Sequence, residues 1–224
     1  WLIYRKSFGV TDVPDQLIAR IAADSKYWLW INDQLVIFEG GLKRGPSPSG
    51  TYYDPVDIAP YLTKGSNTIA ILLWHFGKDG FSHINSGKAA LLFEAIAPGL
   101  EIVSDASWQC ALYEAYQNTE APFPNYRMPE SNIRFDARQA ITNWNRTSFE
   151  GSLPGAVCVG KAGKAPFGEL VERPIPQWKN SGLLSYVSVR ESLRGDTLFC
   201  RLPYNAQITP YLKVEAEACL LYTS

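Results

Sequence analysis

The most constraining feature of the sequence is an unbroken apolar run, Ile69-Ala70-Ile71-Leu72-Leu73-Trp74, which follows a Gly65-Ser66-Asn67 turn. A short apolar run after a turn signal predicts a strand that is buried on both faces. We therefore expect the chain to be organised around a central strand at residues 69–74.

The preceding residues predict a hairpin. Tyr27-Trp28-Leu29-Trp30-Ile31 and Leu35-Val36-Ile37-Phe38 are aromatic, β-branched or aliphatic runs of the kind that form strands. Asn32 and Asp33 lie between them, and both residue types tolerate the positive φ that tight hairpin turns require. The two runs should therefore be adjacent antiparallel strands.

Further strand-like runs occur along the first three quarters of the chain, and sustained helical periodicity is absent. The sequence predicts an all-β fold, a jelly-roll β-sandwich, with additional strands at residues 4–8, 17–23, 51–58, 89–95, 133–140 and 156–159. Trp144 and Phe149 are expected to cover an edge of the sandwich. Asp57 is expected to cap the turn at residues 60–62 through its side-chain oxygen.

Two long polar segments, residues 40–50 and 76–88, are rich in Gly, Pro and Ser and are expected to be surface loops. If successive strands run up and down, both loops leave the same end of the sandwich. Arg44, Asp79 and His83 would then lie near one another, with Trp74 at the rim. We interpret these four residues as candidate carbohydrate contacts, because sugars present an apolar face and a rim of hydroxyls. Trp74 as a core residue, and the other three as solvated loop residues, are the alternative.

Composition excludes several classes of function. The chain has 21 basic and 22 acidic residues. It has no basic stripe of the kind that binds nucleic acid and no polybasic segment of the kind that binds an anionic membrane surface. Its longest apolar run is far shorter than the ~20 residues that cross a bilayer, so no membrane insertion is expected. Four cysteines without C-x-x-C spacing are expected to be buried free thiols, and the sequence indicates neither a metal site nor a cofactor.

No catalytic residue can be assigned from the sequence. Glycoside hydrolysis needs two carboxyl groups facing each other across the sugar. The chain has many carboxylates, but none forms a distinctive pair, and each is equally explained as a turn former, cap or loop charge. A nucleophile elbow and a phosphate-binding glycine loop are also absent from the sequence.

Several motifs resemble one enzyme family. Asp57-Ile58-Ala59-Pro60-Tyr61-Leu62 followed by Gly65-Ser66-Asn67-Thr68-Ile69-Ala70 looks like the D-x-x-x-x-L-x-x-G-x-N-x-I-A signature of galactose-binding-like jelly rolls. Two further short motifs resemble the N-terminal region of bacterial α-L-rhamnosidases of glycoside hydrolase family 78: Asp105-Ala106-Ser107-Trp108 and Phe135-Asp136-Ala137-Arg138. Asp33 stands where that family commonly has Gly, which leaves the turn type open.

The sequence suggests two domains. We expect a galactose-binding-like jelly roll at residues 1–178 and, after a proline-containing strap at residues 170–183, an incomplete second β domain at residues 179–224, with strands near 185–190, 198–202 and 211–216. Residues 219–224 fit poorly with the preceding sequence and are interpreted as foreign sequence at the end of a fragment.

The resemblance implies a non-catalytic N-terminal part of an inverting enzyme that removes terminal α-L-rhamnose. Its partners would be the enzyme's own downstream (α/α) barrel, which carries the catalytic acid and base, and a rhamnosylated glycan. Family members are commonly periplasmic or extracellular in bacteria. A stand-alone carbohydrate-binding module is the alternative, and a jelly roll from a β-galactosidase-type enzyme is a third reading that residues 135–138 disfavour.

Overall fold

The computed structural model of the protein describes residues 1–41, 45, 47–80, 83–119, 132–195, 197–205 and 211. The chain divides into two compact units, Trp1–Trp178 and Lys179–Ser224. The regular elements of the described residues are strands and two short 3-10 turns, which confirms the all-β prediction. No helix in the described part of the chain is long and apolar enough to span a membrane.

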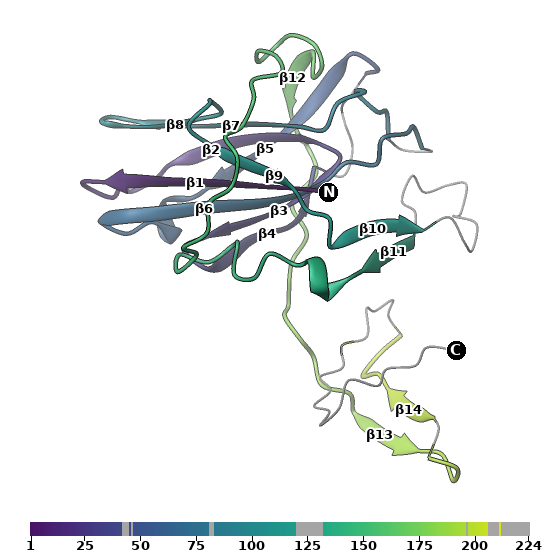
Figure 1. The fold of residues 1–224 in the computed structure, drawn as a ribbon. Helices are drawn as coiled ribbons and strands as arrows, with labels where there is room; N and C mark the ends of the chain where they lie inside the picture. The colour runs from purple at the N-terminus through teal and green to yellow at the C-terminus, as the bar shows by residue number, and fades with distance from the viewer. Residues whose placement is uncertain are drawn as a thin grey trace. The chain divides into compact units, whose positions relative to one another are not determined.

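The first unit is a sandwich of two five-stranded sheets (Figure 1). The first sheet has the strand order β4 (Gln34–Gly40), β3 (Lys26–Ile31), β6 (Gly65–Trp74), β1 (Leu2–Val10) and β9 (Gln109–Leu112). The second has the order β12 (Glu169–Glu172), β5 (Gly50–Asp57), β2 (Ile18–Asp24), β7 (Ala90–Ala97) and β8 (Leu100–Val103). All neighbours are antiparallel except β12 and β5.

Smaller elements complete the described fold. The 3-10 turn η1 (Ala59–Tyr61) precedes β6, and Asp57 Oδ1 accepts a hydrogen bond from Ala59 N at 3.1 Å, as predicted. Strands β10 (Tyr116–Thr119) and β11 (Asn132–Phe135) form a two-stranded sheet, followed by the 3-10 turn η2 (Ala137–Gln139). In the second unit, β13 (Ser188–Glu191) pairs with β14 (Leu198–Arg201).

Strand β6 is buried on both faces, as its sequence predicts. Ile69, Ile71 and Leu73 point into the core between the two sheets. Ala70 and Leu72 point to the opposite face, where they join a second apolar cluster with Ile3, Tyr113, Ala115, Trp144 and Leu153. The first sheet therefore has a cover on its outer face, which we call the covering segment (residues 137–153).

The hairpin turn shows why aspartate occupies its second position. Asn32 and Asp33 have φ angles of 46° and 71°, so both adopt the left-handed conformation expected of a tight hairpin. The Asp33 carboxylate accepts hydrogen bonds from Thr147 N at 2.6 Å and from Thr147 Oγ1 at 3.1 Å. A glycine would relieve backbone strain at this position but could not bind the covering segment.

Arg5 holds the covering segment from strand β1 of the first sheet. Its side chain is buried and donates hydrogen bonds to the carbonyl oxygens of Trp144 at 3.0 Å and Arg146 at 2.8 Å. Its guanidinium carbon lies 5.3 Å from the centre of the Phe149 ring. Because irregular backbone must find partners for its carbonyl groups when it packs on a sheet, Arg5 supplies what the covering segment lacks.

Four expectations about the chain after residue 98 are wrong. The strand near 133–140 pairs with β10 instead of the sandwich, and ends at Phe135. Residues 156–159 form no strand; only Gly155 makes an isolated bridge, to Gln109. The last strand of the sandwich is instead β12, in the region expected to be a strap. Trp144 covers the face of the first sheet and not an edge.

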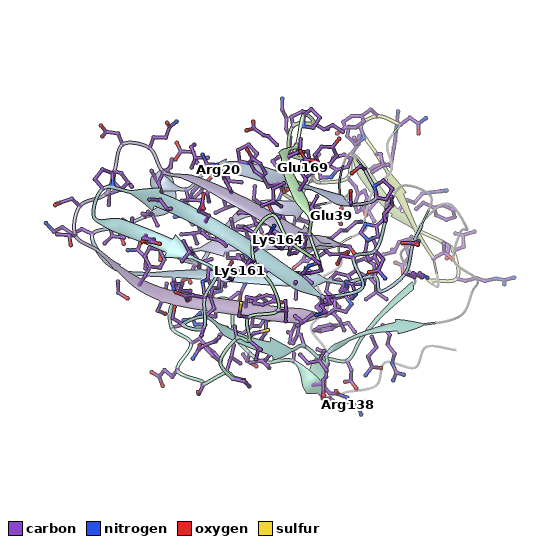
Figure 2. The ribbon with its side chains drawn as sticks, turned by 90° about the horizontal axis from the view of Figure 1, so that it is seen from above. Arg20, Glu39, Arg138, Lys161, Lys164 and Glu169 are labelled. Carbon is purple, nitrogen blue, oxygen red and sulfur yellow. The ribbon has the colours of Figure 1, made fainter. Side chains whose placement is uncertain are left out.

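We expect Arg5→Ala to destabilise the first unit by about 2–4 kcal/mol, since one buried and one partly buried carbonyl group lose their partner and the aliphatic stem no longer packs. The matched control is Arg20→Ala. Arg20 is half-exposed on the second sheet (Figure 2), and its ion pair with Glu94 is worth at most about 1 kcal/mol. Urea unfolding measures both. Equal effects of the two substitutions would contradict the role given to Arg5.

Candidate functional site

The two polar loops leave the same end of the sandwich, as expected. Strands β4 and β6 both run antiparallel to β3, on either side of it. Gly40 at the end of β4 faces Tyr27, and Trp74 at the end of β6 faces Lys26. The loops that follow therefore start next to each other, beside the first residues of β3.

Trp74 is part of the core at this end. The residue is 5% exposed, and its ring stacks on Trp1 with ring centres 4.5 Å apart. The Phe76 ring packs against it in an edge arrangement with ring centres 4.9 Å apart, and Lys26 Nζ lies 5.8 Å from the centre of the Trp74 ring. Trp74 is thus surrounded by other side chains and offers little surface to a ligand.

His83 is also buried, with an exposed fraction of 1%, in a polar cluster at the junction of β2 and β3. Its Nε2 lies 3.0 Å from Asp24 Oδ1 and 3.1 Å from Ser25 Oγ. Ser25 Oγ donates to Asp24 Oδ1 at 2.7 Å and accepts from Phe76 N at 3.1 Å. The cluster ties the loop after β6 to the point where the chain crosses from the second sheet to the first.

Asp24 is the centre of this cluster. Its carboxylate also accepts from Ser86 N at 2.6 Å, and His75 Nδ1 lies 3.2 Å from its backbone oxygen. Desolvation by burial raises the pKa of Asp24, but the hydrogen bonds from His75, His83 and Ser86 together outweigh it and hold the pKa far below the usual range. The carboxylate is therefore ionised and fully engaged in structure.

A second buried carboxylate lies at the same end. Asp54 Oδ2 accepts from the Tyr27 hydroxyl at 2.7 Å and from Gly41 N at 3.1 Å, and Arg173 Nε lies 2.7 Å from Asp54 Oδ1. Burial, and then the charge of Asp54, raises the pKa of Tyr27 well above its ordinary value. Asp54 thus fixes the root of the other loop, just as Asp24 fixes the loop after β6.

The four predicted contacts have different positions. Trp74 and His83 are brought together, each packing on Phe76, but both are buried. Asp79 is exposed and accepts from Asn85 N at 2.7 Å. Arg44 lies outside the described residues. Their role as sugar contacts stays a prediction.

The sequence analysis did not predict the roles of Asp24 and Ser25. The only signal for them was an acidic residue between two apolar strands.

The polar cluster around Asp24 does not have the geometry of a catalytic site. Ser25, His83 and Asp24 are a hydroxyl, an imidazole and a carboxylate in contact, but each is essentially inaccessible to solvent. The hydroxyl proton of Ser25 already bonds Asp24, so the serine is not aligned for attack on a substrate. Among the described residues, no three His, Cys, Asp or Glu side chains gather in a way that could hold a metal ion.

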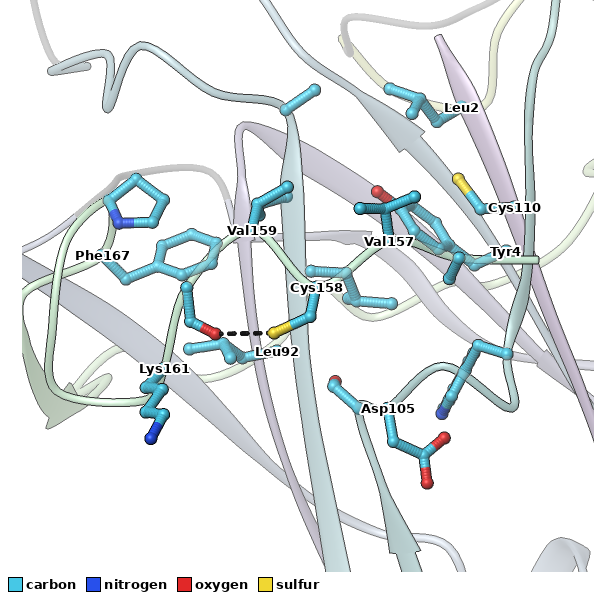
Figure 3. Close-up of a pocket in the computed structure, with 18 of the residues that line it drawn as sticks. Leu2, Tyr4, Leu92, Asp105, Cys110, Val157, Cys158, Val159, Lys161 and Phe167 are labelled. Atoms are coloured by element: carbon cyan, nitrogen blue, oxygen red, sulfur yellow. Dashed lines mark hydrogen bonds between the residues drawn. The ribbon is translucent and has the colours of Figure 1, made fainter. Parts of the chain in front are cut away.

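A cavity of about 330 Å³ opens on another side of the sandwich, between β7 and β9 (Figure 3). Its walls are mostly apolar and include Leu2, Leu92, Trp108, Val157 and Phe167. Two thiols, Cys110 and Cys158, line it. The expectation that the cysteines are buried is wrong for Cys158 and Cys200, which are free and exposed, whereas Cys110 is free and partly buried.

We expect Trp74→Ala to lower the free energy of unfolding by about 3–5 kcal/mol, as for a large aromatic residue in a core. Trp178→Ala is the matched control, because Trp178 is 61% exposed and its loss should cost little. Thermal or urea unfolding reports both. A Trp74 variant as stable as the Trp178 variant would contradict the core assignment.

The Asp24 cluster predicts acid sensitivity. Since the folded-state pKa of Asp24 is depressed, its stabilisation is present above the unfolded pKa of about 3.9 and is lost as pH falls below that value. Asp24→Asn should therefore cost roughly 2–4 kcal/mol at pH 7 and progressively less below pH ~4. Urea unfolding of the variant and the unsubstituted chain, at pH 7 and below pH ~4, measures the difference in their free energies of unfolding. A cost independent of pH would refute this account.

Known structures resemble the chain, although no protein-family model and no curated protein matches it. The GH78 family rhamnosidase of Bacillus sp. GL1 is 30% identical over 85% of this chain, with a TM-score of 0.75. The α-L-rhamnosidases of Dictyoglumus thermophilum and Aspergillus terreus share the fold at 20% identity each, with TM-scores of 0.58 and 0.59, over 85% and 87% of this chain. The chain spans only 20%, 21% and 23% of these three chains, respectively. The predicted resemblance is thus confirmed: the chain is similar in sequence and fold to about one fifth of a GH78 α-L-rhamnosidase.

Proposed function

We propose that the chain acts as a non-catalytic accessory region of a larger, α-L-rhamnosidase-like glycoside hydrolase. The observation that carries this proposal is the similarity to one part of the Bacillus enzyme, which extends over 85% of this chain but 20% of that one. In such a protein, hydrolysis of terminal α-L-rhamnosyl linkages would be performed by an (α/α) barrel, and this region would support and orient that barrel. A location in the bacterial periplasm or outside the cell remains a prediction.

The state of the buried carboxylates supports a non-catalytic role. An inverting glycosidase needs one carboxylic acid to protonate the leaving group and one carboxylate to activate water. Asp24 and Asp54 are the two buried aspartates of the described residues, and each is held by several donors inside the sandwich. Neither is available to a glycosidic bond.

The exposed apolar side chains of the second unit favour the presence of a partner domain that covers them. In the β13–β14 hairpin, Val189, Leu198 and Phe199 are each at least 50% exposed. An isolated two-stranded hairpin is marginally stable in water, so such side chains are normally covered. A further domain of the same protein is the partner that the similarity to longer enzymes favours.

The proposal predicts that the purified 224-residue chain does not hydrolyse p-nitrophenyl α-L-rhamnoside, because it contributes no catalytic pair. The Bacillus sp. GL1 rhamnosidase is the positive control. Turnover that copurifies with the chain and is lost on its unfolding would contradict the proposal. Saturable binding of L-rhamnose by the isolated chain would instead favour the alternative of a carbohydrate-binding module.

The supporting role is tested in the Bacillus enzyme itself. Deleting the region that matches this chain should lower the melting temperature and the yield of active enzyme. Replacing that region with this chain should restore at least part of both, since the two regions share a fold. An enzyme that keeps its stability and activity after the deletion would exclude a supporting role.

A further inference from the structure

One edge of the second sheet is only partly paired. Strand β7 begins at Ala90, but β8 pairs with it only from Glu94 onward. Ser104, the residue after β8, makes the last contact along this edge, with Phe93. Ser104 N donates to Phe93 O at 2.9 Å, and its Oγ accepts from Phe93 N at 2.6 Å. Backbone groups two residues apart on a strand point to the same side, so the N–H and C=O of Leu91 point to this edge too. Among the described residues, no strand lies beside Leu91 there.

The cavity of about 330 Å³ lies beside this open edge. Leu91 and Leu92 form one wall, Tyr4 and Cys110 of the first sheet form another, and residues 155–161 cross in front of them (Figure 3). A volume of this order is at the lower end of small-molecule sites, which combine apolar walls with a few polar anchors. The backbone groups of Leu91 are anchors of that kind.

Two charged side chains, Lys161 and Asp105, line the cavity, and they differ in their partners. Lys161 lines the cavity, and no described carboxylate lies within ion-pair distance of its ammonium group. Asp105 also lines the cavity, but Lys6 Nζ lies 3.3 Å from its carboxylate and Ser107 N donates to it at 2.9 Å. Figure 3 shows Lys161 and Asp105 at separate ends of the site. A ligand with an apolar body and one anionic group would match this arrangement.

We propose that the cavity between β7 and β9 binds a small amphipathic carboxylate, with its apolar body against Leu92 and Phe167 and its anionic group at Lys161. This site is separate from the loops predicted to contact carbohydrate, and it does not depend on the accessory role in a rhamnosidase.

Thiol protection in the 224-residue chain tests the proposal. Decanoate, below its micellar concentration, should slow the alkylation of Cys110 and Cys158 by iodoacetamide, as measured for each cysteine by peptide mass spectrometry. Cys200 is the internal control, because it is exposed in the second unit and does not line the cavity. Equal rates with and without decanoate at all three cysteines would overturn the proposal, and so would equal slowing of all three.

Two lysine variants test the position of the anionic group. Lys161→Gln should weaken protection by decanoate roughly threefold, which is the scale of a partly screened charge interaction. Decanol has the same apolar chain without the charge, so it should protect the two cysteines more weakly, and Lys161→Gln should leave that protection unchanged. Lys164→Gln is the matched control, since Lys164 lies three residues further along the same loop but outside the cavity lining (Figure 2). If both variants behave alike, or if an extended apolar peptide protects the two cysteines and decanoate does not, the carboxylate site is wrong.

Discussion

The burial of strand β6 on both faces is the constraint on which the rest of the first unit depends. An apolar strand of this kind needs a second layer on the outer side of its sheet. The chain supplies that layer with irregular backbone, whose polar groups must be satisfied. Arg5 and Asp33 meet this requirement from the sheet, one by donating to carbonyl groups and the other by accepting from Thr147. The sandwich and its cover are therefore a single packed structure.

Two buried carboxylates fix one end of the sandwich in a comparable way. Asp24 binds groups from the loop after β6, and Asp54 connects the second sheet to Tyr27 and Gly41 of the first. Acidic side chains are costly to bury unless they are hydrogen-bonded, and Asp24 and Asp54 each accept several hydrogen bonds. This end of the molecule therefore uses its polar residues for structure, which agrees with an accessory role. The charge available for a ligand lies elsewhere, at Lys161.

Local patterns in the sequence predicted the elements that depend on neighbouring residues. The hairpin followed from Asn32 and Asp33, the two-sided strand from its apolar run, and the cap at Asp57 from the turn after it. Contacts between distant segments were not predictable in this way. Nothing local indicates that β11 pairs with β10, that Trp144 packs on the face of the first sheet, or that Asp24 meets His83 across 59 positions. The cavity was missed for the same reason, because its walls come from four separate stretches.

We have proposed that this sandwich is one part of a larger glycoside hydrolase. The most direct measurement is the DNA sequence of the source reading frame beyond residue 224. We expect the frame to continue with further β sequence and then several hundred residues of helical repeats with clustered Asp and Glu. A frame that stops within a few dozen residues would rule out the accessory role, since no catalytic barrel would remain for this region to support.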